Sequence, residues 1–176
     1  MASLTSSIPA FVPLRPVVLP LTARPDLAPL VARWIWEGFW QEQGAMKAEA
    51  DAFVSSAATA TGMPQAFVLL LGGTPAGTAS LVADDLGARP DLTPWLASVW
   101  VEPWARGQGH AGALVRAVED AAREAGVGTL WLYTRRAERT YQRAGWVTLE
   151  RFTHLGSPAA LMRRTIHSGG ISQEPG

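Results

Sequence analysis

The sequence predicts a mixed α/β fold with helices on both faces of a central sheet. Short apolar runs that fit strands alternate with amphipathic segments that fit helices. Residues 96–133 read as strand, glycine-rich turn, helix and strand, which predicts a parallel strand pair. The 176 residues, 48% of them hydrophobic and 17% charged, are enough for one substantial core. We therefore expect a single domain over residues 14–166, a flexible arm over 1–13 and a loose tail over 167–176.

The helix that follows the glycine turn has the clearest pattern. Apolar residues recur there at three- and four-residue spacing: Ala111, Leu114, Val115, Val118, Ala122 and Ala125. The other side is expected to be polar, with ion pairs between Arg116 and Asp120 and between Glu119 and Arg123, each four residues apart. Gly126 supplies the end of the helix.

The remaining elements come from the same signals, taken in chain order. Before the glycine turn we expect a strand over 16–21, helices over 25–39 and 46–59, and strands over 66–71 and 74–84. Gly77 within the last of these indicates a bulge. After the helix come a strand over 129–133, a short helix over 136–144, and two segments that alternate like antiparallel edge strands, 146–152 and 159–165.

Charge and composition exclude several classes of protein. The formal net charge of zero argues against a nucleic-acid binder. Up to Glu102 there are five basic and nine acidic side chains, and from Pro103 onward ten arginines and six acids. A basic half suits a phosphorylated cofactor, and an acidic half suits a cationic partner. Chance variation in charge between two solvated surfaces is the alternative explanation.

The chain has no cysteine, which excludes disulfides, thiolate zinc sites and a cysteine nucleophile. The apolar run over residues 8–21 lacks the basic leader of a signal peptide and is broken by four prolines. No stretch reaches the length of a membrane span. His154 and His167 are isolated and have no metal-ligand spacing. We therefore expect a cytoplasmic protein without a metal or a membrane partner.

The glycine turn has the properties of an anion site. First-turn N–H groups of a helix have no intrahelical partner, and the helix dipole places about half a positive charge there. Gly107 and Gly109 remove the Cβ atoms that would keep a phosphate from the backbone. Arg106 would add a fixed charge at the rim. These features predict a pyrophosphate site.

Two common phosphate-binding motifs fit less well. Residues 107–112 match the G-x-G-x-x-G dinucleotide pattern, but four residues separate them from the strand. The acid expected near the end of the next strand is replaced by Leu132, Tyr133 and Thr134. No Lys-Ser/Thr pair follows the glycines, so the segment is not a Walker P-loop either.

Two segments resemble the GNAT superfamily of N-acetyltransferases. Arg106, Gly109 and Ala111 fill the three fixed positions of its acyl-CoA-binding pattern, Gln/Arg-x-x-Gly-x-Gly/Ala. About 30 residues later, residues 137–146 are similar to the family's Ala-x-x-x-Tyr-x-x-x-Gly-Phe segment, with Tyr141 at the tyrosine position. The resemblance covers roughly residues 81–152. It implies a central mixed, mostly antiparallel sheet with splayed parallel strands, and acetyl-CoA as the cofactor.

The resemblance also implies roles for individual residues. The expected cofactor-binding residues lie along the strand and the turn: Val99, Trp100, Val101, Arg106, Gly107, Gln108, Gly109, His110, Ala111 and Gly112. Tyr141 would be the catalytic acid that protonates the departing thiolate, with a buried structural tyrosine as the alternative. Arg136 stands where many relatives have an asparagine that contacts the pantetheine, so this chain departs from the family's pattern at that contact. Arg136, Arg139 and Arg143 would meet the 3′-phosphate or be solvated.

The acceptor is predicted from aromatic side chains. Trp36 and Trp40 lie where the family builds its acceptor wall, and tryptophan faces attract cations. This favours transfer to a primary amine on a small cationic or aromatic molecule. Peptide N-termini, lysine side chains and a non-catalytic acyl-CoA sensor are the alternatives, and a homodimer is left open. No general base is assigned among the acids near the strand ends: Asp84, Asp85, Asp91 and Glu102.

Overall fold

A seven-stranded sheet forms the centre of the computed structural model, which describes residues 15–167. The strands are β1 (Pro16–Pro20), β2 (Gln65–Leu71), β3 (Thr74–Val82), β4 (Trp95–Val101), β5 (Thr129–Thr134), β6 (Val147–His154) and β7 (Ser157–Thr165), in the order β1-β2-β3-β4-β5-β7-β6. Among the strands of residues 15–167, β4 and β5 are the one parallel pair. The predicted arm over 1–13 and the predicted tail, apart from His167, lie outside the described residues.

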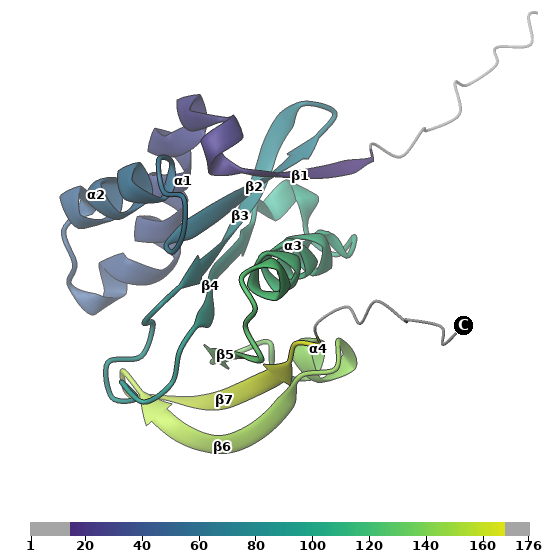
Figure 1. The fold of residues 1–176 in the computed structure, drawn as a ribbon. Coiled ribbons are helices and arrows are strands. Elements are labelled where there is room, and N and C mark those ends of the chain that lie inside the picture. Colours follow the sequence, from purple (N-terminus) through teal and green to yellow (C-terminus); the bar gives the residue numbers. More distant parts are fainter. Residues whose placement is uncertain (1–14, 168–176) are drawn as a thin grey trace, which may run out of the picture.

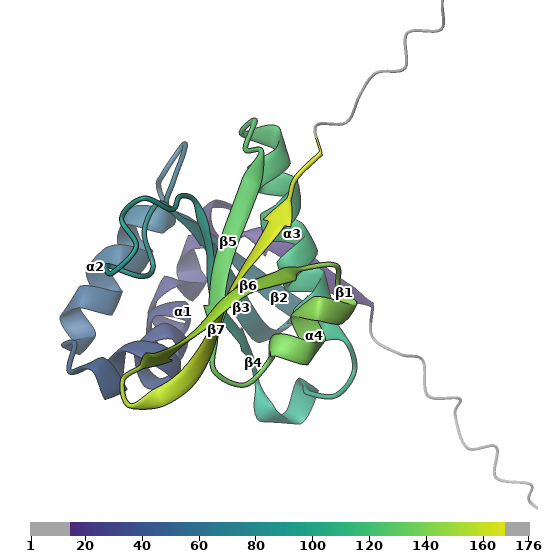
Figure 2. The ribbon, with the colours of Figure 1, turned by 90° about the horizontal axis from the view of Figure 1, so that it is seen from below.

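Helices cover both faces of the sheet. They are α1 (Ala28–Ile35), α2 (Lys47–Ala57), α3 (His110–Glu124) and α4 (Glu138–Arg143). Figures 1 and 2 show α1 and α2 on one side of the strands and α3 and α4 on the other. The segment predicted as one helix over 25–39 consists of three successive pieces. These are a 3-10 turn, the helix α1 and a π-helical turn over Trp36–Trp40. The predicted fold class, a mostly antiparallel mixed sheet between helices, is confirmed.

Side chains of β5 alternate between two cores. Leu130 and Leu132 are buried with α3, in the cluster that Tyr141 also contacts. Trp131 and Tyr133 pack instead against a cluster on the opposite face, which contains Trp95. Because successive strand residues point to opposite faces, β5 contributes to both sides of the sheet at once.

Two bulges shape the middle of the sheet. One lies in β3 beside Gly77, where the β2–β3 register shifts after Leu69, as predicted. The other lies in β4, because Thr78 pairs with Trp100 while Ser80 pairs with Ala97, which leaves one extra β4 residue. Ser98, within this bulge, has a left-handed φ of 54°.

After Trp95, β4 and β5 separate. Their only paired position in the described chain is Trp95 with Trp131, at the start of β4. A bulge bends its strand and increases its twist, so the bulge at Ser98 accounts for the divergence. The sheet is therefore open in its centre along the second half of β4.

One sequence prediction about a strand and two about ion pairs were wrong. The segment over 159–165 is not an edge strand, because β7 inserts between β5 and β6. Glu119 does not pair with Arg123, which instead pairs with Asp120, the residue expected to pair with Arg116. Glu119 lies on the buried side of α3, where it accepts a hydrogen bond from Trp146 Nε1 at 3.1 Å and forms an ion pair with Arg164 Nε at 3.0 Å. The tryptophan N–H and the guanidinium thus offset the desolvation of the Glu119 carboxylate.

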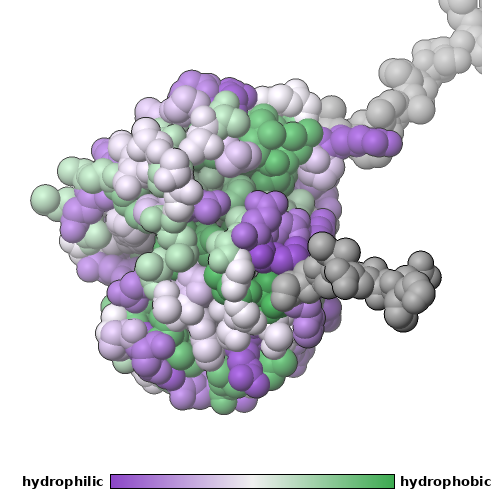
Figure 3. Space-filling view, viewed as in Figure 1, coloured by the Kyte–Doolittle hydropathy of each residue, from purple (hydrophilic) through white to green (hydrophobic). Residues whose placement is uncertain are grey.

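The surface is mixed in character. The face in Figure 3 intersperses hydrophilic and hydrophobic residues, with a hydrophobic area near β1, where Val17 is 47% exposed. Within residues 15–167, no helix combines the length and the apolar character needed to cross a membrane.

Gly77 provides a test of the bulged centre. A Cβ atom at this position would collide with the backbone oxygen of Trp100 and would lie 3.2 Å from Leu114 Cδ1. We expect Gly77→Ala to lower the free energy of unfolding by about 2 kcal/mol, because β3 must move away from β4. Urea unfolding measures this. Gly87→Ala is the control, since no atom lies within 4 Å of its Cβ position. Equal stability of the two variants would contradict the close approach.

Candidate active site

A cavity of about 390 Å³ lies where β4 and β5 diverge. Its lining comes from β4 over residues 96–99, from β5 and the following loop over 132–137, and from the segment between α1 and α2. Asp85, Tyr141 and His154 complete it. Since Tyr141 belongs to the α3 side and Tyr133 to the opposite side, the cavity is lined by residues from both faces of the sheet.

The glycine turn leads from β4 into α3, and residues 106–112 are not among those that line the cavity. Gly107 and Gly109 have φ angles of 75° and 79°, a conformation that glycine adopts without strain. No atom lies within 4 Å of either Cβ position, so the turn is open outwards. Within the described chain, the N–H groups of residues 107–111 donate to no other backbone group. The turn therefore offers unpaired donors at the positive end of a 15-residue helix.

Arg106 braces the base of this turn. Its Nε donates a 2.8 Å hydrogen bond to the Val101 carbonyl, and its guanidinium lies 4.9 Å from the centre of the Trp100 ring. Trp100 in turn packs on Gly38, whose Cβ position is 2.8 Å from Trp100 Cε3. The end of β4 is thus held against the segment that follows α1.

Tyr141 reaches the cavity from α4. Its ring packs edge-on against Trp146 at 5.9 Å, and burial raises the pKa of its phenol to about 12. A phenol with a raised pKa keeps its proton at neutral pH. It can therefore act as a proton donor to a strongly basic group beside it.

The opposite side of the cavity contains side chains that the sequence did not point to. Tyr133 and His154 are in edge-to-face contact at 4.9 Å, and both line the cavity. Burial, and then the charge of Asp85, raise the pKa of Tyr133 to about 12. His154 Nε2 is buried and has no hydrogen-bond partner in the described chain. His154 was expected to be isolated, and only the β6–β7 hairpin register brings it to this place.

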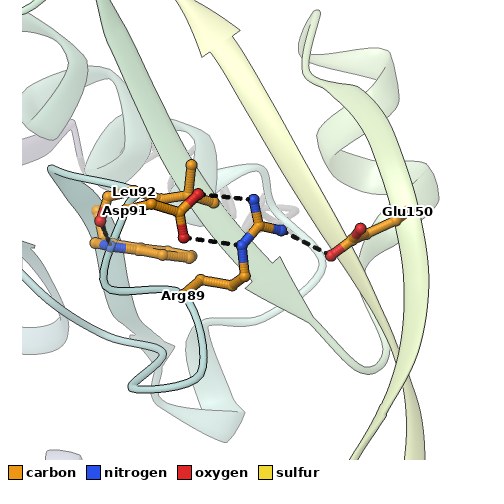
Figure 4. Close-up of polar contacts among 5 residues, drawn as sticks. Arg89, Asp91, Leu92 and Glu150 are labelled. Carbon is orange, nitrogen blue, oxygen red and sulfur yellow. Dashed lines mark hydrogen bonds and ion pairs between the residues drawn. The ribbon is translucent and has the colours of Figure 1, made fainter.

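Asp85 lies in the same part of the cavity. Burial, with a smaller contribution from neighbouring Asp84, raises the pKa of its carboxyl to about 7. Its loop is fixed further along, because Arg89 pairs with Asp91 at 3.1 Å and with Glu150 of β6 at 2.9 Å (Figure 4). The loop that holds Asp85 is therefore anchored to a different strand.

The other predicted site residues fall in different environments. Trp40 lines the cavity, whereas the Trp36 indole donates to the Ala45 carbonyl at 3.0 Å and is not among the lining residues. Arg136 lines the cavity, and Arg139 and Arg143 are exposed. His110 is the first residue of α3.

The four candidate acids are also separated by the structure. Asp84 is exposed, and Asp91 is engaged by Arg89. Glu102 accepts a 2.6 Å hydrogen bond from Trp34 Nε1, which ties the end of β4 to α1. Of these acids, Asp85 is the one that lines the cavity.

Comparisons with known proteins identify the class. The sequence pattern described as "Acetyltransferase (GNAT) family" matches residues 30–146. The chain therefore belongs to this family, whose members transfer an acetyl group from acetyl-CoA, and acetyl-CoA is its cofactor. No curated protein matches the sequence.

Solved structures share the fold at low identity. A GNAT-family acetyltransferase from Streptococcus pneumoniae is 17% identical, with a TM-score of 0.65 over 87% of this chain and 100% of the other. Salmonella typhimurium yncA with its cofactor acetyl-CoA is 13% identical, with a TM-score of 0.68 over 90% and 98%. An aminoglycoside 6'-acetyltransferase type Ii is 16% identical, with a TM-score of 0.65 over 86% and 97%.

The raised pKa of Asp85 makes stability depend on pH. The native chain retains the Asp85 proton between about pH 4 and pH 7, whereas the unfolded chain has lost it. The folded state thus binds more protons in this window, and stability should fall as pH rises through it. In Asp85→Asn the free energy of unfolding should therefore fall less between about pH 4 and pH 7. This variant should be more stable than the wild type at pH 8. Urea unfolding at several pH values measures the effect.

Asp84→Asn is the matched control for this experiment, because Asp84 is the exposed neighbour of Asp85. An Asp85→Asn variant with the same pH profile of stability as Asp84→Asn would contradict the desolvated carboxyl.

Proposed function

We propose that the protein is an N-acetyltransferase that moves the acetyl group of acetyl-CoA to a primary amine on a small cationic or aromatic molecule. The observation that carries this proposal is the cavity at the β4–β5 divergence, lined from both faces of the sheet. A donor held on the α3 side and an acceptor held on the opposite side would meet there. Such positioning converts a bimolecular step into an effectively unimolecular one.

The donor side fits coenzyme A in charge and in shape. The unpaired N–H groups over residues 107–111 suit the diphosphate, and the second half of β4, which β5 does not pair, suits an extended arm that bonds to the backbone. Val99 lies both on this strand and in the cavity lining. Arg136, which also lines the cavity, adds a positive charge on the α4 side. When bound, acetyl-CoA supplies an activated thioester.

Tyr141 is proposed as the acid. It lies on the same face of the sheet as α3 and lines the cavity, so its hydroxyl is available to a group that leaves from the donor side. Its phenol is protonated at neutral pH because burial disfavours the phenolate. Tyr141 would give its proton to the departing sulfur, and the product thiol could then leave uncharged.

The acceptor side fits a small amine. Phe39, Trp40 and Tyr133 provide aromatic surface, and Asp85 provides negative charge. A volume of about 390 Å³ is in the range of small-molecule pockets. One solved structure that shares the fold is named an aminoglycoside 6'-acetyltransferase, and an aminoglycoside is a small molecule that carries amino groups. A peptide acceptor would need a more open groove, so we favour a small molecule.

The activity is tested by mass spectrometry of an amine panel incubated with acetyl-CoA. Acetylated product is the expected result. Binding of CoA without any acetylated amine would favour the non-catalytic sensor instead.

Tyr141→Phe tests the acid. We expect kcat to fall about 100-fold while the Kd for CoA changes little, because only the proton donor is removed. Steady-state kinetics and calorimetry measure the two quantities. Thr140→Ala, which alters an exposed neighbour on α4, serves as the control. Unchanged kcat in Tyr141→Phe would remove the tyrosine from the mechanism.

A further inference from the structure

We propose that Asp85 is the general base of the reaction, the carboxylate that takes the proton from the ammonium of the acceptor. This inference rests on the proposed function and names the group that it leaves unassigned. An ammonium has no lone pair, so it must lose a proton before its nitrogen can attack a carbonyl carbon. A base within the acceptor side of the cavity is therefore a chemical requirement.

Position is the first argument. Asp85 lines the cavity together with Tyr133 and His154, on the side of the sheet opposite Tyr141. The base and the acid thus face the reacting centre from its two ends, with β4 and β5 between them.

The local electrostatics are the second argument. Asp85 is partly buried, and within the described chain neither a hydrogen bond nor an ion pair stabilises its carboxylate, while nearby Asp84 adds repulsion. A carboxylate that is partly withdrawn from water without a pairing cation is stabilised when a cationic ligand binds beside it. The desolvation of the Asp85 carboxylate in the free protein fits a carboxyl whose cationic partner arrives with the substrate. The resulting pKa of about 7 is well matched to proton transfer at neutral pH.

Surrounding groups leave this carboxyl free for a ligand. Tyr133 of β5 and His154 of β6 contact each other at 4.9 Å and form an aromatic rim. Arg135, on the loop after β5, pairs with Glu42, and both residues line the cavity. Because Glu42 already pairs with Arg135, the ammonium of an incoming acceptor would be the cation that pairs with Asp85.

Rigidity is the third argument. The loop between β3 and β4 is held by Arg89, which bridges Asp91 and Glu150 (Figure 4), and by Trp95 Nε1, which donates to the Leu92 carbonyl at 2.7 Å. A base needs a fixed position relative to the proton that it removes. These contacts give the Asp85 loop two anchors in the sheet.

The proton balance closes with Asp85 and Tyr141 alone. One ammonium N–H bond breaks, and its proton goes to the Asp85 carboxylate. The freed lone pair forms the new C–N bond while the C–S bond breaks, and the sulfur takes a proton from Tyr141. The second proton that the nitrogen loses returns to Tyr141, and Asp85 releases its own to solvent. One proton is released per acetyl group transferred, and no oxidant or metal is consumed.

The test is the pH profile of kcat/KM for Asp85→Asn, with an amine that the wild type acetylates. We expect about a 100-fold loss at pH 7.5. The wild type should be nearly independent of pH above about pH 7, whereas the variant, which needs an amine that is already deprotonated, should gain about tenfold per pH unit until the amine pKa is reached. A structural role for Asp85 would not produce this change in slope.

Three controls make the outcome decisive. Asp84→Asn should keep the wild-type plateau above about pH 7, with its lower limb shifted slightly to lower pH because the smaller contribution to the raised pKa of Asp85 is gone. The Kd of Asp85→Asn for CoA should remain within about twofold of the wild type, which shows that the fold is intact. Equal activity of Asp85→Asn and Asp84→Asn would overturn the assignment of Asp85 but not the proposed function. Loss of the wild-type pH profile in His154→Gln, with the profile kept in Asp85→Asn, would do the same. A wild-type protein that acetylates no amine would overturn the proposed function and this inference together.

Discussion

The separation of β4 from β5 is the constraint on which the site depends. An ordinary parallel pair would be hydrogen-bonded along its length, and the centre of the sheet would be closed. Here an extra residue in β4, with Ser98 in a left-handed conformation, turns the strand away from β5 after Trp95. The backbone beyond the bulge and the space beside it become available for a cofactor and an acceptor.

The remaining elements keep that opening in place and give its two sides different chemistry. On one side, α3 presents unpaired N–H groups and α4 presents Tyr141. On the other side, the loop after β3 and the end of β6 bring Asp85 and His154 together. The strands between them keep the anion-binding end apart from the side where a cation would bind. This separation of charge suits a phosphorylated donor on one side and a cationic acceptor on the other.

Sequence reasoning predicted the elements with strong local signals. The α3 helix follows from a regular apolar spacing and the glycine stop at Gly126, which has a φ of 73°. The strands around Gly77 were predicted in the same way, including the bulge. The resemblance of residues 106–111 and 137–146 to one family then gave the class, because two spaced motifs are more specific than either alone.

Features that depend on long-range packing could not be predicted in this way. Glu119 looked like a surface residue, and only the positions of Trp146 and Arg164, from other elements, explain its burial. His154 has no local signal, since its place is set by the hairpin register of β6 and β7. Asp85 was one of four equivalent acids in the sequence, and burial in the folded chain distinguishes it.

Hydrogen–deuterium exchange in the presence and absence of CoA tests the central claim most directly. If the cofactor lies along the open half of β4 and ends at the α3 turn, CoA should slow exchange of the amides over residues 98–101 and 107–111, and leave the β6–β7 hairpin little changed. Protection confined to other segments, or none at saturating CoA, would contradict the account.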